Sequence, residues 1–252
     1  MRDDLTIDGP VRPSVYSPVE HLVLSAGDNV KAAAAAAIAQ HAVLWQDFTR
    51  VMGMRSAIDG SGAQPGSGDP VGWIEDRIMA TNAVAPSAGT RPSLSASGGL
   101  QFNGVDQALN LPFVGGAGPS SADIFAVVQT DDDPYIVLDI LTESSPPNRF
   151  IFCSQDGNAA NPRGNIGAAT VHIDNGPAIA SRDALHDARP ASTFLLEARG
   201  ADLSSFDGFL IGHAHISGFE YAGRIDHIIV GNLAASGYDR DALRAAIGVL
   251  MS

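Results

Sequence analysis

Cysteine and basic residues are scarce in this sequence. The 252 residues include a single cysteine, Cys153, which excludes an internal disulfide and fits a buried thiol. Lys and Arg total 15 against 28 Asp and Glu, a formal net charge of −13. Because nucleic acids and anionic membranes bind clustered basic side chains, this balance excludes both as partners.

The sequence also lacks the long apolar segments of export signals and membrane spans. Its start, Met1-Arg2-Asp3-Asp4, is acidic, and no apolar run follows it. The run Ala32–Ala37 is too short and too weakly hydrophobic to cross a bilayer. We therefore expect no membrane insertion, and a chain that is made in the cytoplasm and leaves it only as part of a larger assembly such as a virion.

Short β patterns fill most of the chain. Expected strands lie near 43–51, 71–78, 99–103, 105–111, 122–129, 135–141, 149–153, 166–173, 193–198, 208–216 and 225–230. Stretches rich in Gly, Ser and Pro separate many of them and predict loops. Several strands are apolar on both faces, as central strands of a sandwich are. The pattern predicts an all-β fold of two antiparallel sheets with helices only near the ends.

The stretch 98–112 carries the clearest local signal. Asn103-Gly104 tolerates the positive φ angles of a type I′ turn, and Val105, Gln107, Leu109 and Leu111 follow it at every second position. We therefore expect a β-hairpin with strands 99–103 and 105–111.

Helical patterns lie near both ends. An Ala-rich helix begins after Asp28 or Asn29, and its small side chains favour an anchoring or oligomerising segment over a helix that caps the domain. This places an arm and helix at 1–42 and the main domain at 43–252. A second helix, expected over 238–251 with a cap at Asp239 or Ser236, is expected to pack on the edge of the sandwich.

Residues 102–109, Phe-Asn-Gly-Val-Asp-Gln-Ala-Leu, resemble the Phe-Asp-Gly-Val-Asp-Asp-Tyr-Leu signature of concanavalin A-like (laminin G-like) jelly-roll domains. Other segments resemble the same family in the same order: Leu44–Phe48, Pro70–Asp76, Arg91-Pro92 and Gly223–Val230. The resemblance covers roughly residues 43 to 252 and implies a two-sheet jelly roll.

The resemblance also implies a function. Such jelly rolls, in acidic chains with a non-globular N-terminal segment, look like adhesion components of phage-like particles, either tail fibres or head spikes of tailed phages and gene transfer agents. The implied role is a non-catalytic, homo-oligomeric binder of a bacterial capsule or lipopolysaccharide glycan that contacts other particle proteins through residues 1–42. The alternatives are a polysaccharide hydrolase or lyase on the same fold, and a structural decoration protein without a ligand.

Candidate glycan contacts follow from the chemistry of sugars, which present an apolar face and a rim of hydroxyls. Loop residues that combine an aromatic ring with planar hydrogen-bonding groups fit this chemistry: Tyr135, Asn148, Arg149, Asn158, Asn161 and Arg163. Trp45 and Trp73 fall on expected core strands and are interpreted as core residues.

Catalytic and metal sites are not expected. The glutamates do not form the Glu-x-Asp-x-x-Glu pattern of a jelly-roll hydrolase, which leaves Glu197 and Glu220 as a conceivable pair across strands. His213 and His215 share one strand face without a third ligand. We expect no cofactor, with calcium at an oxygen-rich loop, 131–133 or 156–161, as the alternative.

Overall fold

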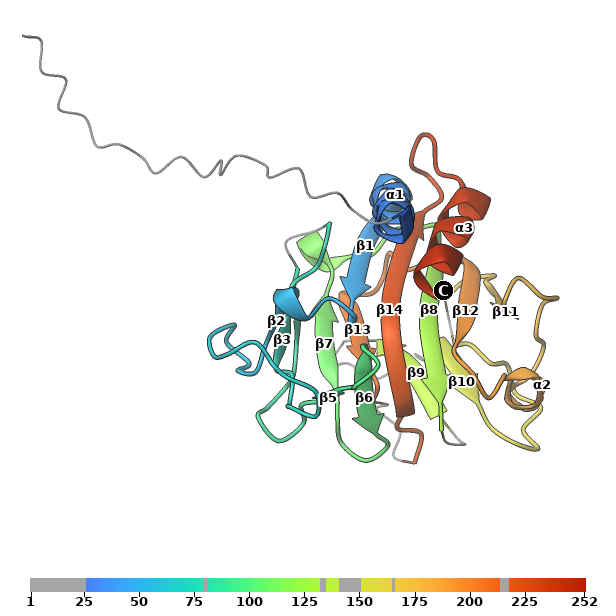
Figure 1. Ribbon diagram of the computed structural model, residues 1–252. Coiled ribbons are helices and arrows are strands. Elements are labelled where there is room, and N and C mark those ends of the chain that lie inside the picture. Colours follow the sequence, from blue (N-terminus) through green and yellow to red (C-terminus); the bar gives the residue numbers. More distant parts are fainter. Residues whose placement is uncertain (1–25, 79–80, 132–134, 141–150, 165, 214–217) are drawn as a thin grey trace, which may run out of the picture.

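The computed structural model describes residues 26–78, 81–131, 135–140, 151–164, 166–213 and 218–252. In this part of the chain the strands form two antiparallel sheets that pack face to face, and two helices cover the outer face of one of them (Figure 1). The predicted all-β sandwich, with a helix near each end, is therefore confirmed. The two sheets also fit a jelly roll.

The first sheet has the order β11 (Thr170–Ile173), β12 (Phe194–Ala201), β8 (Ala122–Thr130), β14 (Ala222–Asn232), β6 (Leu100–Asn103) and β5 (Ser93–Leu94), and β1 (Ala42–Asp47) also pairs with β14. The second has the order β10 (Ile151–Ser154), β9 (Tyr135–Ile140), β13 (Gly208–Ile211), β7 (Leu109–Pro112), β4 (Ala83–Val84), β3 (Trp73–Ile74) and β2 (Met54–Arg55). The α-helices are α1 (Ala26–His41), α2 (Arg182–Ala188) and α3 (Arg240–Leu250), and two 3₁₀ turns are η1 (Val51–Gly53) and η2 (Val114–Gly116).

Strand β14 joins most of the first sheet. One of its edges pairs with β8, and the other pairs with β1 over residues 227–231 and with β6 over residues 222–225. Figure 1 shows β1 and β6 one after the other beside β14. Between them the register with β8 shifts, because Ile225 faces Val128 while His227 faces Val127. Asp226 is the extra residue of a β-bulge.

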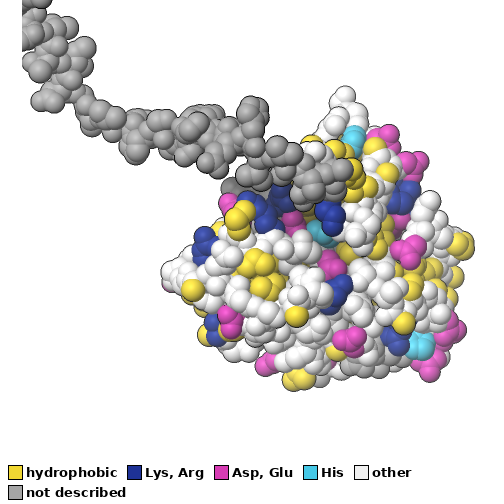
Figure 2. Space-filling model, viewed as in Figure 1, with side chains coloured by type: hydrophobic (Ala, Val, Ile, Leu, Met, Phe, Trp, Pro, Cys, Tyr) yellow, Lys and Arg dark blue, Asp and Glu magenta, His cyan; other side chains and the backbone are white. Residues whose placement is uncertain are grey.

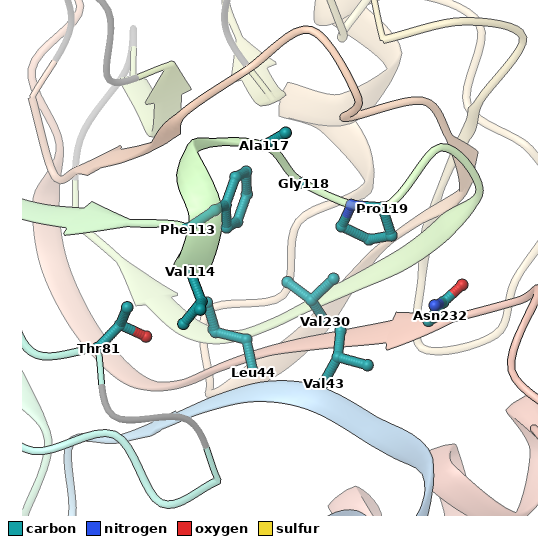
Figure 3. A pocket seen from close by; sticks show the side chains of 10 residues that line it. All are labelled: Val43, Leu44, Thr81, Phe113, Val114, Ala117, Gly118, Pro119, Val230 and Asn232. Atoms are coloured by element: carbon teal, nitrogen blue, oxygen red, sulfur yellow. The ribbon is translucent and has the colours of Figure 1, made fainter.

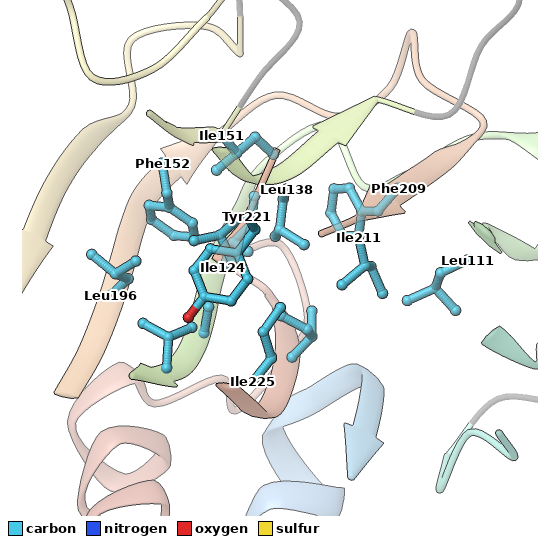
Figure 4. Packing of buried hydrophobic residues seen from close by; sticks show 14 of the residues in the cluster. Leu111, Ile124, Leu138, Ile151, Phe152, Leu196, Phe209, Ile211, Tyr221 and Ile225 are labelled. Carbon is cyan, nitrogen blue, oxygen red and sulfur yellow. The ribbon is translucent and has the colours of Figure 1, made fainter. Parts of the chain in front are cut away.

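The core between the sheets is formed by alternate side chains of the strands. On β8, Ile124, Ala126 and Val128 point into this core, while Phe125 and Val127 point to the outer face. Figure 4 shows side chains of both sheets that meet in this core. Both faces of β8 are therefore covered, which explains its apolar sequence.

A second apolar cluster holds the helices on the first sheet. Ala34 and Ile38 of α1 and Ile247 of α3 pack on Trp45 and Phe125. The expected position of α3 at the edge was wrong, because its apolar stripe lies on the face of the sheet. Helix α1 packs beside α3, as a capping helix does, and the division of the chain at residue 42 stays a prediction.

The predicted Asn103-Gly104 hairpin is wrong. Strand β6 belongs to the first sheet and β7 to the second, so the segment between them crosses the sandwich. The Asn103 side chain prevents a two-residue turn, because its Oδ1 accepts hydrogen bonds from the backbone N–H groups of Val105 (3.0 Å) and Asp106 (3.3 Å). Val105, expected on the apolar face, is 67% exposed.

Two buried carboxylates fasten α3 to the sheet. Glu197 on β12, fully buried, accepts from Arg244 at 2.9 and 3.0 Å and from Arg199 at 2.9 Å. Asp123 on β8 accepts from Arg240 at 2.5 and 2.9 Å and from the Tyr238 hydroxyl at 2.7 Å. These charge-assisted bonds orient α3 on the sheet. Because the two carboxylates are buried, removal of an arginine would leave a buried charge without its partner and destabilise the fold.

Replacement of Arg244 should therefore destabilise the fold strongly. We expect Arg244→Met to lower the free energy of unfolding by about 3 kcal/mol, because the buried Glu197 carboxylate loses its bidentate partner. The double variant Glu197→Gln, Arg244→Met should lose less, because no buried charge is then left with half of its partners. Urea denaturation of the two variants and the unchanged protein measures this, and equal losses in both variants would contradict it.

Candidate functional site

The predicted glycan contacts do not form one surface. Tyr135 is fully buried in the core, and the centre of its ring lies 5.8 Å from that of Tyr221. Its ring therefore offers no exposed platform for a sugar, which corrects the expectation of a loop residue. Asn148 and Arg149 lie outside the described residues. Trp45 is buried, as expected of a core residue.

Asn158, Asn161 and Arg163 do come together in the loop that follows β10. Helix α2 holds this loop, because the Asp183 N–H donates to the Asn158 carbonyl (3.0 Å) and the Asp183 carboxylate accepts from the Gly157 N–H (2.7 Å). The side-chain oxygens of both asparagines accept backbone N–H groups of the same loop, at 2.8 and 3.2 Å. These two side-chain amides thus stabilise the loop itself. Contact of the loop with a glycan stays a prediction.

The other groups singled out in the sequence do not assemble into a site. The Glu197 carboxylate is held by Arg244 and Arg199, and Glu220 accepts from the Gly218 N–H at 2.9 Å. Among the described residues no three His, Cys, Asp or Glu side chains are grouped as a metal would require. His215 and two of the three aspartates at 131–133 lie outside the described residues.

An apolar cavity of about 250 Å³ opens between the sheets near η2. Figure 3 shows Leu44 and Val230 on one side of it and Phe113 on the other, with Pro119 and Asn232 toward one end. Its lining is mostly hydrocarbon, so it offers few groups for orienting a polar ligand.

A second cavity, of about 270 Å³, is lined mainly by polar side chains and lies outside the sandwich core. We call it the polar pocket. Its polar lining includes Lys31, Thr49, Ser97, Thr193, Arg224 and Asp226. These residues come from α1, from the segments after β1 and before β6, from the position just before β12, and from β14. Sequence reasoning missed it, because these residues are scattered along the chain.

Arg224 organises the polar pocket. Its Nε and Nη2 donate to the Asp226 carboxylate at 2.8 and 3.1 Å, its Nη1 donates to Ser97 Oγ at 2.7 Å, and its Nη2 also donates to Thr193 Oγ1 at 2.7 Å. A planar guanidinium bound at so many points has one orientation. The pocket is therefore pre-formed around a paired cation and anion.

His227 forms the buried end of this pocket. Its Nδ1 lies 3.4 Å from Asp47 Oδ1 and 3.5 Å from Trp45 Nε1. Burial lowers the pKa of His227 below its ordinary value of 6.5, although the nearby carboxylates of Asp47 and Asp226 act in the opposite direction. The imidazole is thus held neutral next to the ion pair of Arg77 with Asp47, whose charged atoms are 2.7 Å apart.

Comparison with known proteins gives little likeness. No protein-family model matches the chain, and no curated protein matches it either. One solved structure that is similar is a Trypanosoma rangeli sialidase in complex with 2,3-difluoro-KDN, at 14% identity and a TM-score of 0.40. The match covers 88% of this chain and 38% of that chain. At these values the likeness carries no argument about substrate or site.

This comparison nevertheless contradicts one expectation. The sequence predicted that the chain is not an enzyme, and the similar structure is that of a sialidase, which is an enzyme. The expectation of a non-catalytic protein is therefore corrected. Within the described residues, every helix is too short or too polar to cross a membrane.

The buried histidine predicts a pH-dependent stability. Since the pKa of His227 is lower in the folded chain, the unfolded chain binds more protons as the pH falls below 6.5. The stability that neutral His227 contributes is present above that pH and is lost as the pH falls through the folded pKa. His227→Gln should remove this part of the pH dependence. Thermal unfolding of both proteins between pH 8 and pH 5 measures it, and parallel curves would contradict it.

Proposed function

We propose that this chain is a carbohydrate-binding β-sandwich that attaches a phage-like particle to a polysaccharide on a bacterial surface. The observation that carries the proposal is the position of the resembling segments. Leu44–Phe48 covers most of β1 and the residue after it, and Pro70–Asp76 contains β3. Residues 102–109 lead from β6 to β7, and Gly223–Val230 lies on β14, before α3. They therefore fall on strands of both sheets of a sandwich, the fold that the resemblance implies.

The surface chemistry supports a glycan ligand. The loop 155–164 presents amides and Arg163 beside α2, and the polar pocket combines hydroxyls with a paired guanidinium and carboxylate. Such groups match the hydroxyl rim of a sugar. A formal net charge of −13 disfavours DNA or an anionic bilayer as the partner.

Particle attachment is proposed for the segment before α1. Helix α1 itself is part of the folded domain, since its residues Ala34 and Ile38 are buried in a cluster with side chains of α3 and β1. Residues 1–25 are then the part of the chain proposed to bind other particle proteins. Several copies on one particle would bind a surface polysaccharide together, and their avidity would exceed the affinity of one site.

Binding to cells tests the glycan ligand. We expect the purified protein to bind bacteria that carry a surface polysaccharide, and to lose at least nine tenths of this binding on an isogenic strain without capsule and lipopolysaccharide outer chains. Flow cytometry with labelled protein measures binding, and chain length and reducing ends of the isolated polysaccharide show in the same samples whether it is cleaved. Equal binding to both strains would refute the proposal.

Truncation tests the attachment. Deletion of residues 1–25 should leave the melting temperature unchanged, because it keeps α1, and should abolish incorporation into particles. Deletion of residues 1–42 should also lower the melting temperature, because it uncovers apolar side chains around Trp45. Immunoblots of purified particles and thermal scans measure the two effects. Incorporation of the chain without residues 1–25 would show that the anchor lies elsewhere.

A further inference from the structure

We propose that the polar pocket binds a single pyranose unit through a pair of neighbouring hydroxyls. The proposal rests on the glycan binding proposed above and adds the place where the sugar is held. It assigns the ligand to the outer face of the first sheet, at the bulge of β14, and not to the loop 155–164. Figure 2 shows basic, acidic and histidine side chains gathered on the face that is turned to the viewer.

The backbone creates the pocket by an interruption of the sheet. Strand β1 ends at Asp47 and β6 begins at Leu100, so Asp226 has no partner in either strand, although the Phe48 N–H donates to its carbonyl oxygen at 2.9 Å. Thr49 and Ser97, which follow β1 and precede β6, border this gap. The side chains of Arg224, Asp226 and His227 line the pocket at this change of partner.

The β-bulge turns two consecutive side chains into this gap. Neighbouring residues of a regular strand point to opposite faces, yet Asp226 and His227 both line the pocket. Ile225 and Ile228, on either side of them, both point into the core between the sheets. The extra residue therefore adds a carboxylate to the pocket without disturbing the core, a use of bulges that is common beside functional sites.

Gly99 keeps space for this carboxylate. Its φ is +77°, a conformation that favours glycine, and a Cβ atom at this position would collide with Asp226 Oδ1. The close approach of the Gly99 backbone to Asp226 Oδ1, the oxygen that also accepts from Arg224 Nε, restricts the position of the carboxylate. Asp226 is only 14% exposed, so its position is set before any ligand arrives.

The arrangement of donors and acceptors suits two adjacent hydroxyls. Arg224 and Asp226 lie side by side, so one sugar hydroxyl can accept from the guanidinium while its neighbour donates to the carboxylate. Thr193 Oγ1 accepts from Arg224, which leaves its own O–H group to donate to a sugar oxygen. Contacts of this kind define the orientation of a ring more sharply than charge alone.

The remaining wall is apolar and comes from β8 and from the end of α3. Val127 of β8, Leu250 of α3 and Met251 line the same pocket and provide a surface for the carbon-bound hydrogens of a sugar ring. A volume of about 270 Å³ is slightly below the range of roughly 300–1,000 Å³ that is usual for drug-sized ligands. The pocket therefore has room for one ring of a polysaccharide and not for several.

Methionine methyl groups give a direct test, because Met251 lines the pocket and Met54 is buried in the core between the sheets. The full chain, labelled with ¹³C at the methionine methyls, is titrated with the methyl glycosides of glucose, galactose, mannose and glucuronic acid. We expect at least one glycoside to shift the Met251 signal saturably, with a Kd in the millimolar range, while the Met54 signal stays in place. Met251→Leu assigns the signal.

Matched variants decide between a specific site and a general effect. Thr193→Val and Ser97→Ala, which each remove one hydroxyl from the pocket, should weaken the binding at least tenfold. Thr81→Val removes a hydroxyl at the apolar cavity and should bind like the unchanged protein. Unchanged Met54 signals show that each variant is folded.

The other outcomes separate the two proposals. Two outcomes would overturn the assignment of the pocket and leave the proposed function in place. In the first, the protein binds cells but no glycoside shifts the Met251 signal. In the second, Thr193→Val and Ser97→Ala bind as tightly as the unchanged protein. Absence of binding to every glycoside and to cells would overturn both.

Discussion

The pairing of β14 is the constraint on which the rest of the structure depends. Its residues bond to β8 on one edge and to both β1 and β6 on the other, while its inner face fills the core and its outer face supports the helices. A strand covered on every side must be apolar wherever it is regular. The sequence Ile228-Ile229-Val230 meets this demand. The polar residues Arg224, Asp226 and His227 lie where the partners change and the register shifts. These three polar side chains of β14 thus lie at or beside its bulge.

Much of this fold could be predicted from local sequence, because the pattern of a strand depends on its two faces. The bounds and apolar character of β8 and one of the two expected caps of α3, Asp239, were readable in this way, whereas β14 is longer at both ends than the expected strand 225–230. The pairing of the strands was harder to predict from the sequence. Asn103-Gly104 has the composition of a hairpin turn, yet its side chain binds the following N–H groups and sends the chain to the other sheet. Nothing in the local sequence distinguishes these two uses of one asparagine.

The polar pocket shows the same limit for sites. Its lining comes from seven separate segments, and none of them carries a motif of its own. The signals that were present are indirect: a charged run within an apolar strand, and the pair Gly98-Gly99 just before β6, where Gly99 leaves room for the Asp226 carboxylate. Conversely, residues that looked suitable by type, such as Tyr135, proved to be part of the core. Residue type suggested chemistry, but burial and register decided which side chains face solvent together.

The path of the chain between β1 and β6 has one more consequence. After Phe48 the chain leaves the first sheet, forms β2, β3 and β4 at one edge of the second, and returns to the first sheet through β5. Later segments repeat this exchange, since β7, the pair β9–β10, and β13 each follow a strand of the opposite layer. The chain therefore crosses between the two layers at many points. Each layer is therefore built from strands taken from along the whole sequence, and neither layer corresponds to one contiguous segment of the chain.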